Sequence, residues 1–242
     1  MKRVLLIIPA YNEEGSIQKT VSMIEQYKHA TDLPFVLDYI VINDGSTDAT
    51  PQILDREGIP HIDLVQNLGI GGGVQTGYLY ANRQGYDVAV QFDGDGQHDI
   101  ASIEDVVGPV LTEEADFTIG SRFIDKSKEN FQSTFMRRVG INLISFAIRL
   151  VTRKKIYDTT SGYRAANARV IAYFSKRYPV AYPEPESIVR LLKKGYKVKE
   201  VPANMFEREE GVSSIRAFKS VTYMIDVLTS ILIAGFMKES DS

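Results

Sequence analysis

The chain has 242 residues, a formal net charge of −3 and a sequence pI near 5.7. Hydrophobic residues make up 44% and charged residues 24% of it, which is ordinary for a soluble globular protein, and one large α/β domain is the simplest expectation. The acidic balance argues against a nucleic-acid partner. The lack of cysteine excludes disulfides and cysteine-ligated metal sites.

Short apolar runs alternate with helical patterns through residues 1–120. The runs predict strands at 4–8, 39–42, 62–65, 88–92 and 117–119. Helices are expected to begin at Gly15 or Ser16, at Thr50, after Gly73 and at Ser102. This alternation with short connections is typical of a doubly wound, mostly parallel α/β sheet.

The fourth apolar run ends abruptly in two carboxylates, Asp93 and Asp95, with one glycine between them. Ligands of open α/β sheets bind beyond the carboxyl ends of the strands, so both side chains are expected in that crevice. Two carboxylates so close repel each other unless a cation binds between them, and Mg²⁺ and Mn²⁺ prefer oxygen ligands. An ordinary acidic turn is the alternative interpretation.

The glycine-rich stretch 69–73 satisfies neither common phosphate-binding motif. Tyr78 stands where a Walker-A lysine would be, and Val74 occupies the third glycine position of a dinucleotide fingerprint. Two interpretations stay open: a flexible loop before a helix, and a close approach of backbone to a phosphate or base at a helix N-terminus.

Several motifs, taken in their order along the chain, resemble those of the family-2 glycosyltransferases. They are Ile8-Pro-Ala-Tyr-Asn-Glu-Glu14, Val41-Ile-Asn-Asp-Gly-Ser-Thr-Asp48, Asn67-x-Gly69, Asp93-Gly-Asp95, Gly120-Ser-Arg122, the run 158–164, Glu186, Glu200-Val-Pro202 and Arg208-x-x-Gly211-x-Ser213. The second half is most similar to the dolichyl- and polyprenyl-phosphate sugar synthases. The resemblance implies a GT-A fold with a nucleotide-sugar-binding half and an acceptor-binding second half.

The resemblance also implies roles for individual residues on the donor side. Nucleotide contacts are expected from Pro9, Tyr11, Glu13, Asp44, Asn67, Gly69 and Asp93, and contacts to Mg²⁺ or Mn²⁺ from Asp93, Asp95 and Gln97. A divalent ion facing the departing diphosphate would lower the barrier as a Lewis acid. The residues expected to take part in the reaction itself are Asp93, Asp95, Arg122 and Glu186.

A lipid phosphate acceptor is already an anion, so its site needs cations more than a strong base. Acceptor contacts are expected from Arg122, Arg138, Asp158, Arg164, Arg208, Ser213 and Ser214. Arginine suits this role because its planar guanidinium binds phosphate in a bidentate manner, although any single arginine could be an ordinary surface side chain. Glu186 could act as a base toward a sugar hydroxyl, or could be a carboxylate at a helix start.

The sequence predicts a catalytic domain over residues 1–215 and an amphipathic helix within 216–242. The apolar stripe within 221–237 is too short and too polar to span a bilayer. We expect it to lie on the inner, cytoplasmic face of the cell membrane, to contact a small integral membrane partner, or to pair with a second copy of the chain. A second amphipathic helix, predicted over 135–151, suits either a membrane surface or the core.

Residues and resemblance together predict a metal-dependent inverting glycosyltransferase. It would move a hexose or N-acetylhexosamine from a nucleotide sugar, with a UDP-sugar favoured, to a polyprenyl phosphate. One alternative is an enzyme that elongates a cell-surface polysaccharide or lipid-linked glycan at a sugar hydroxyl. A more remote alternative is a catalytically weak subunit that binds nucleotide sugars, but the intact Asp44, Asp93 and Asp95 argue against it.

Overall fold

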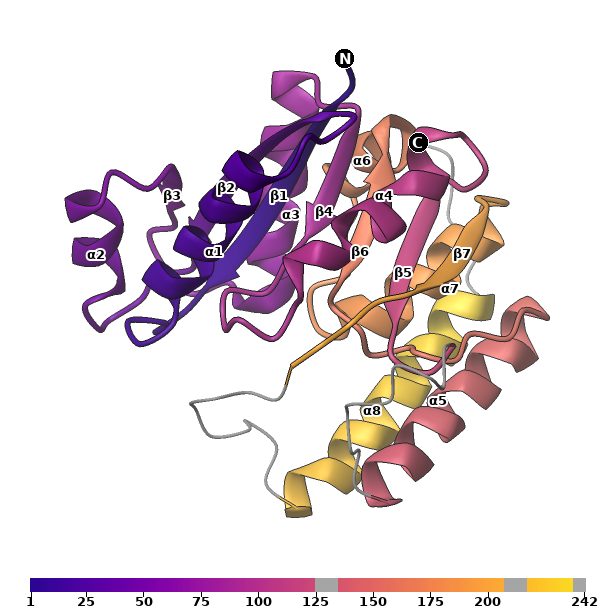
Figure 1. Cartoon of the computed structure of the whole chain (residues 1–242). Coiled ribbons are helices and arrows are strands. Elements are labelled where there is room, and N and C mark those ends of the chain that lie inside the picture. Colours follow the sequence, from indigo (N-terminus) through magenta and orange to yellow (C-terminus); the bar gives the residue numbers. More distant parts are fainter. Residues whose placement is uncertain (125–134, 207–216, 237–242) are drawn as a thin grey trace.

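A mixed seven-stranded sheet forms the centre of the molecule (Figure 1). The computed structural model describes residues 1–124, 135–206 and 217–236. Within these ranges the strands are β1 (Arg3–Ala10), β2 (Val36–Asn43), β3 (His61–Asp63), β4 (Val88–Gln91), β5 (Phe117–Ser121), β6 (Arg164–Asn167) and β7 (Val198–Pro202). Their order is β3-β2-β1-β4-β6-β5-β7, and β6 is antiparallel to both of its neighbours while the other pairs are parallel. The predicted doubly wound, mostly parallel sheet is confirmed.

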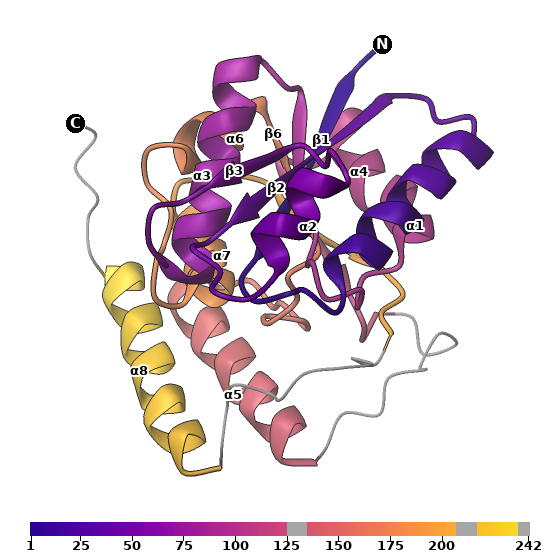
Figure 2. The same cartoon turned by 90° about the vertical axis from the view of Figure 1, so that its left-hand side faces the viewer.

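Helices cover both faces of this sheet (Figure 2). One core cluster joins the sheet to α1 (Ile17–Ala30), α2 (Thr50–Arg56) and α4 (Ile103–Leu111), which follows the short 3-10 helix η1 (Ile100–Ser102). The other cluster joins it to α3 (Gly69–Gln84), α5 (Phe135–Thr152), α6 (Ala168–Phe174), α7 (Pro183–Lys193) and α8 (Ala217–Phe236). Strand β1 contributes Leu6 and Ile8 to the first cluster and Leu5 and Ile7 to the second, which explains its continuous apolar run.

The bounds of the predicted strands differ most from the structure in β2 and β3. Strand β2 begins at Val36 rather than at residue 39, because residues 36–38 pair with Arg3–Leu5 of β1 although Val36 is exposed and Asp38 is charged. Strand β3 ends at Asp63, and Val65 is fully exposed after it. The apolar pattern alone therefore does not predict where these strands end, because pairing with the neighbouring strand decides their ends.

Helices α5 and α8 lie side by side and extend past the edge of the sheet where β1 and β5 end (Figures 1 and 2). Val227 and Ile231 of α8 are fully buried in the second core cluster, together with Ile148 of α5. The C-terminal helix is thus packed onto the sheet-bearing part of the molecule. Among the described helices, none is long and apolar enough to cross a membrane.

Candidate functional site

The loops that follow β1 and β2 are hydrogen-bonded to each other at the carboxyl edge of the sheet. The N–H of Asn12 donates to Ser46 Oγ at 3.0 Å, and Asn12 Oδ1 accepts from the N–H of Thr47 at 2.8 Å. One residue later, the N–H of Glu13 donates to Thr50 Oγ1 at 2.9 Å. Two loops that are distant in sequence are therefore joined into one structure at this edge of the sheet, which we call the rim. The predicted nucleotide contacts Pro9, Tyr11 and Glu13 belong to it.

Asp44 ties this rim to the loop after β3. Its side chain is buried, and Oδ1 accepts the N–H of Leu68 at 2.7 Å. Gly45 has φ +68°, and a Cβ at this position would lie 2.8 Å from the backbone nitrogen of Asn67. Only glycine fits there, so the Asp44-Gly45 pair fixes the turn that contains the predicted nucleotide contacts Asn67 and Gly69.

The glycine-rich stretch begins α3 directly, since the helix starts at Gly69 rather than after Gly73. A Cβ on Gly71 would lie 2.5 Å from the carbonyl oxygens of Pro179 and Val180. A Cβ on Gly77 would lie 2.1 Å from the Ile7 side chain. Close packing of α3 against β1 and the loop before α7 thus accounts for these two glycines, and the first turn of the helix lies at the rim.

Asp93 and Asp95 follow β4 in a tight turn at the same edge. The Asp93 side chain is 31% exposed, and Asp95 Oδ1 accepts the N–H of Gln97 at 3.0 Å. A Cβ on Gly162 would lie 2.8 Å and 2.9 Å from the two carboxylate oxygens of Asp93, so the run 158–164 lies directly against this aspartate. The turn after β4 and the run 158–164 therefore meet at Asp93.

The turn offers a suitable donor set for a divalent cation, although no group of three or more His, Cys, Asp or Glu side chains converges in the described part of the chain. Asp93 and Asp95 are both partly exposed, and Gln97 adds an amide oxygen that such a group does not include. Two carboxylates and an amide are oxygen ligands of the kind that Mg²⁺ and Mn²⁺ prefer. The residues present therefore fit the predicted metal by their chemistry.

His98 is enclosed beneath the turn and contacts Asp93. Its ring is 2% exposed, and Nδ1 accepts the backbone N–H of Asp93 at 3.0 Å. Burial lowers the pKa of His98 to about 4, an effect that the Asp95 carboxylate opposes. The contact of 3.3 Å between Nε2 and Asp93 Oδ2 therefore joins a neutral ring to a carboxylate and is not an ion pair.

A buried network holds Arg122 at the end of β5. Its Nε and Nη2 donate to the two oxygens of Asp158 at 2.8 Å and 2.7 Å, and Nη2 also donates to Thr160 Oγ1 at 3.1 Å. Asp158 is fully buried, and its N–H donates to Glu200 Oε1 at 2.8 Å. Three predicted motifs, around residues 122, 158 and 200, thus converge in one network that orients the arginine.

Arg164 lies in the core and does not face a ligand. It is fully buried, and its Nε and Nη1 donate to the carbonyl oxygens of Ser161 and Glu184 at 2.7 Å and 2.8 Å. The expected direct contact with an acceptor does not fit this placement, because these guanidinium donors are committed to backbone carbonyls. Arg164 instead holds the Ser161-Gly162 turn against Asp93 and fixes the start of α7.

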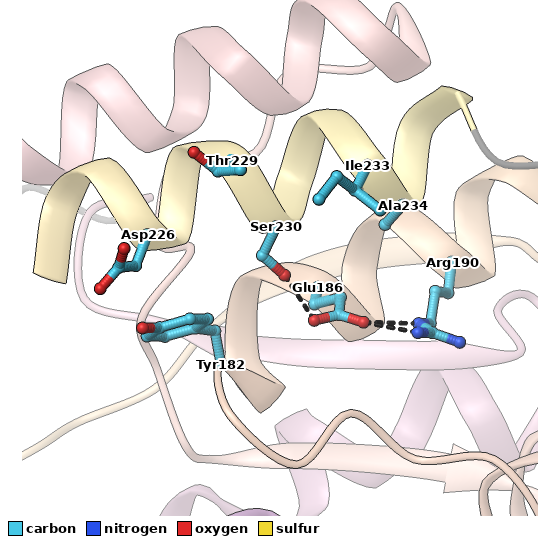
Figure 3. Close-up of a pocket in the computed structure, with 8 residues that line it drawn as sticks. All are labelled: Tyr182, Glu186, Arg190, Asp226, Thr229, Ser230, Ile233 and Ala234. Carbon is cyan, nitrogen blue, oxygen red and sulfur yellow. Dashed lines mark hydrogen bonds and ion pairs between the residues drawn. The ribbon is translucent and has the colours of Figure 1, made fainter.

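Glu186 also lies elsewhere than expected. Its Oε1 accepts from Nε and Nη2 of Arg190 at 2.8 Å and 2.6 Å, and Oε2 accepts from Ser230 of α8 at 2.6 Å (Figure 3). These residues line a cavity of about 410 Å³ between α7 and α8. The helix-start interpretation of Glu186 therefore fits the structure better than a base in the reaction.

Glu184 of α7, which the sequence did not point to, is the carboxylate that interacts electrostatically with Asp93. Burial raises the pKa of Glu184, the Arg164 guanidinium opposes this rise and the Asp93 carboxylate adds to it. Glu184 and Glu186 are two residues apart, and the sequence does not predict which of the two carboxylates lies nearer Asp93. The orientation of α7 decides which carboxylate lies nearer Asp93. The hydrogen bond from Arg164 to the Glu184 carbonyl fixes the start of this helix.

The structure says less about the other residues that were expected to contact the acceptor. Arg138 is exposed on the first turn of α5. Arg208, Ser213 and Ser214 lie outside the described residues. Residue 206 is attached to the turn after β4, since the N–H of Phe206 donates to the carbonyl oxygen of Gln97 at 2.8 Å.

Comparison with known proteins gives matches along most of the chain. Residues 5–174 match the family model described as glycosyl transferase family 2. A UDP-N-acetylglucosamine–dolichyl-phosphate N-acetylglucosaminyltransferase of Methanococcus voltae is 30% identical over 223 residues, which cover 83% of this chain and 84% of the relative. A polyprenol monophosphomannose synthase of Mycolicibacterium smegmatis is 30% identical over 226 residues, with coverages of 88% and 81%.

Solved structures give the same fold. A crystal structure of glucosyl-3-phosphoglycerate synthase from Mycobacterium tuberculosis, in complex with Mn²⁺, UDP and phosphoglyceric acid, superposes with a TM-score of 0.66. The match covers 99% of this chain and 80% of that one at 17% sequence identity. The likeness confirms the GT-A fold that the motif order implies.

Proposed function

The chain belongs to glycosyl transferase family 2 and is a glycosyltransferase, and on this premise we propose that it moves a sugar from a nucleotide sugar to a polyprenyl phosphate. Both relatives described above are named for products on polyisoprenoid phosphates, one on dolichyl phosphate and one on polyprenol. The sugars in their names differ, so the support for the acceptor class is stronger than for the sugar. A hexose or N-acetylhexosamine carried on UDP is the donor that we propose.

One observation carries the proposal: Asp93 lies where the two halves of the molecule meet. The rim tied together by Asp44 lies at the same sheet edge, and the 158–164 run, which belongs to the acceptor half, packs against the Asp93 carboxylate through Gly162. A transferase must bring its donor diphosphate and its acceptor to one point. We propose that Asp93 marks that point.

We further propose that Asp93, Asp95 and Gln97 hold one Mg²⁺ or Mn²⁺ ion. The ion would supply positive charge opposite the departing diphosphate. The likeness to a synthase whose structure contains Mn²⁺ and UDP supports this choice. The residues themselves hold the turn in place: Asp95 caps the N–H of Gln97, and Gln97 is attached to the segment after β7.

Cations on the acceptor side would receive the lipid phosphate. We propose Arg122, oriented by Asp158, together with Arg138, Arg208, Ser213 and Ser214 as candidates for this contact. A phosphate acceptor needs no base, which agrees with the commitment of Glu186 to Arg190 and Ser230. Glu184, whose pKa is raised beside Asp93, keeps a sugar-hydroxyl acceptor as the second candidate, and identification of the product separates the two.

An enzyme that uses a lipid acceptor must also reach the bilayer in which that lipid lies. Helices α5 and α8 extend past the carboxyl edge of the sheet (Figure 2). They carry the exposed apolar side chains Val139, Leu143, Phe146, Leu150, Ile225, Leu232 and Phe236. We call these seven residues the α5–α8 apolar face. We propose that it rests on a membrane surface, because basic residues of α5 and the turn after it, Arg149 and Arg153, are exposed beside it. A small membrane partner or a second copy of the chain would cover the same residues.

The metal proposal is tested by Asp95→Ala. Removing this carboxylate should lower transfer by about 100-fold or more, as loss of a principal electrostatic group does in other enzymes. It should also weaken UDP binding in Mn²⁺ as measured by calorimetry. Asp55→Ala, which removes an exposed carboxylate from α2, is the matched control. A folded Asp95→Ala protein that transfers sugar at the normal rate, or wild-type activity that survives a chelator, would refute the site.

A further inference from the structure

The segment 135–157 differs in charge from the rest of the chain. It contains six basic residues and no acidic residue, although the whole chain has a formal net charge of −3. Four of the basic residues fall within seven positions at the end of α5 and in the turn that follows it: Arg149, Arg153, Lys154 and Lys155. We call these four residues the basic cluster. A concentration of one charge in an otherwise acidic protein marks a surface suited to an anionic partner.

The basic cluster is open to solvent. All four of its side chains are exposed, and among the described residues no carboxylate forms an ion pair with any of them. The Nζ of Lys155 lies 4.2 Å from the centroid of the Tyr157 ring, which is also exposed. Four cations so close together repel one another, and a bound anion would relieve this repulsion.

On α5 the basic cluster begins beside the α5–α8 apolar face. Arg149 follows Phe146 by three positions and directly precedes Leu150, so it lies next to two exposed apolar side chains on the helix surface. An arginine in this position can reach the headgroup level of a bilayer while its apolar neighbours enter the lipid. The same helix therefore offers both kinds of contact that an interfacial helix makes.

The turn after α5 is fixed to the sheet. Ile156 is buried, and the N–H of Tyr157 donates to Glu200 Oε2 of β7 at 2.8 Å. The next residue, Asp158, binds and orients Arg122. The basic cluster thus lies on an anchored segment that leads directly into the network proposed to receive the acceptor phosphate.

We propose that the basic cluster binds the headgroups of anionic phospholipids and docks the enzyme on a negatively charged bilayer. Charges spread over an exposed turn beside an apolar stripe match an array of headgroups better than they match one small anion. Docking there would hold the Arg122 network near the lipid phosphates, at the level where polyprenyl phosphate presents its own phosphate. This consequence for transfer rests on the proposed function, whereas the lipid selectivity is a property of the protein alone.

The selectivity is tested by flotation of the full-length protein without nucleotide sugar, metal or polyprenyl phosphate. The liposomes contain phosphatidylcholine alone or an equal mixture of phosphatidylcholine and phosphatidylglycerol. We expect binding to the anionic liposomes to exceed binding to the neutral ones, and the difference to disappear at high salt because screening weakens the attraction. Equal flotation with both kinds of liposome would overturn the proposal.

The double substitution Arg149→Gln and Lys154→Gln assigns the selectivity to the basic cluster. One basic residue near an anionic surface contributes about fivefold to membrane binding, so the double variant should bind the anionic liposomes about 25-fold more weakly. Arg149→Lys keeps the charge and should bind as wild type does. Thermal unfolding confirms that each variant is folded.

The matched control is Arg83→Gln with Lys197→Gln. It also removes one arginine and one lysine, both exposed, from the end of α3 and the residue before β7, at the opposite edge of the sheet. It should float as wild type does. An equal loss of binding in the two double variants would mean that only net charge matters, and would refute the basic cluster as a binding site.

Polyprenyl phosphate is itself an anion, so a third set of liposomes contains phosphatidylcholine with a small amount of this lipid. Binding that requires polyprenyl phosphate and ignores phosphatidylglycerol would assign the basic cluster to the acceptor and overturn the proposal. Glycolipid formed in detergent by a protein without phosphatidylglycerol selectivity would refute this inference and leave the proposed function intact. Selective binding that the Arg149→Gln and Lys154→Gln variant loses, without any sugar transfer, would support this inference and refute the proposed function.

Discussion

The Asp93 carboxylate is enclosed by atoms that lie far from it in the sequence. His98 contacts it from one side and Gly162 from the other, and the Gly162 turn is held by the buried Arg164. A side chain confined in this way keeps one direction without paying conformational entropy when a ligand binds. We therefore expect the direction of the Asp93 carboxylate to depend on neighbouring residues that do not contact the substrate.

Gly162→Ala should disturb this arrangement with a single methyl group. Its Cβ would lie under 3.0 Å from both Asp93 oxygens, so the carboxylate must rotate or the turn must shift. Because a misplacement of about 1 Å can cost about 100-fold in rate, we expect a loss of that order in transfer, with the fold retained. Steady-state kinetics and thermal unfolding measure the two effects.

Gly108→Ala provides the control for this substitution. A Cβ on Gly108, in α4, meets nothing within 4 Å, and helices favour alanine over glycine. Its activity should equal that of wild type and its stability should be equal or higher. Normal kinetics in Gly162→Ala would mean that Asp93 has room to adapt and that the glycine is not needed for its position.

Sequence patterns located the residues whose chemistry is local. Asp93 and Asp95 were found because two carboxylates directly after an apolar run mark the end of a strand. The sequence around His98 does not predict that the ring of Tyr163 stacks on it, because the two residues are far apart along the chain. The sequence pointed to Glu186 and gave no signal for Glu184, because the position of the start of α7 depends on the hydrogen bond from Arg164 of β6 to the Glu184 carbonyl.

At the scale of elements, α8 has two apolar sides where the sequence indicated one broad stripe. Val227 and Ile231 face inward and are fully buried, whereas Ile225 and Leu232 face outward and are exposed. Deleting residues 221–242 would uncover the core beneath α8, so loss of lipid transfer in such a truncation would not isolate a membrane role. Substitutions on the outward side avoid this ambiguity.

The double substitution Phe146→Ser and Phe236→Ser tests the α5–α8 apolar face. These side chains are 64% and 77% exposed, so replacing them should change stability by no more than about 0.5 kcal/mol each. If the face rests on lipid, the variant should float less with anionic liposomes and transfer less sugar to a long-chain acceptor. Its hydrolysis or transfer with a short-chain acceptor should be unchanged.

Val65→Ser is the matched control, because Val65 is a fully exposed apolar residue away from both helices. It should float with liposomes as wild type does. Flotation that is equal in both variants would exclude a membrane role for the α5–α8 apolar face. A change in sedimentation of the double variant without liposomes would identify a second copy of the chain as the partner.

Elements of the first half were predictable and those of the second half were less so. Strand β1 follows a continuous apolar run, but β6 carries the charged Arg164 and lies antiparallel between β4 and β5. Its register depends on both neighbours, which are separated from it by long stretches of chain. The apolar pattern therefore indicated the doubly wound sheet of the first half, whereas it does not predict an inserted antiparallel strand, and only the motif order indicated the GT-A fold as a whole.

At the scale of the whole molecule, the sheet gathers loops from distant parts of the chain along one edge. The rim after β1, β2 and β3 is fixed by Asp44, the turn with Asp93 and Asp95 follows β4, and the network of Arg122 and Asp158 follows β5. Helices α5 and α8 extend past the same edge (Figure 1). The proposed donor site and the α5–α8 apolar face thus lie on one side of the molecule, as we expect for an enzyme whose acceptor is embedded in lipid.

The most direct test of this account is the identity of the product. Purified full-length protein is incubated with Mn²⁺ and UDP- or GDP-sugars in the presence of polyprenyl phosphate, and the lipid extract is analysed by mass spectrometry. We predict a polyprenyl-phosphate monosaccharide formed from a UDP-sugar, absent in chelator and in Asp95→Ala. A product in which the sugar is joined to a glycan hydroxyl, with no sugar-bearing lipid phosphate from any donor, would contradict the central claim.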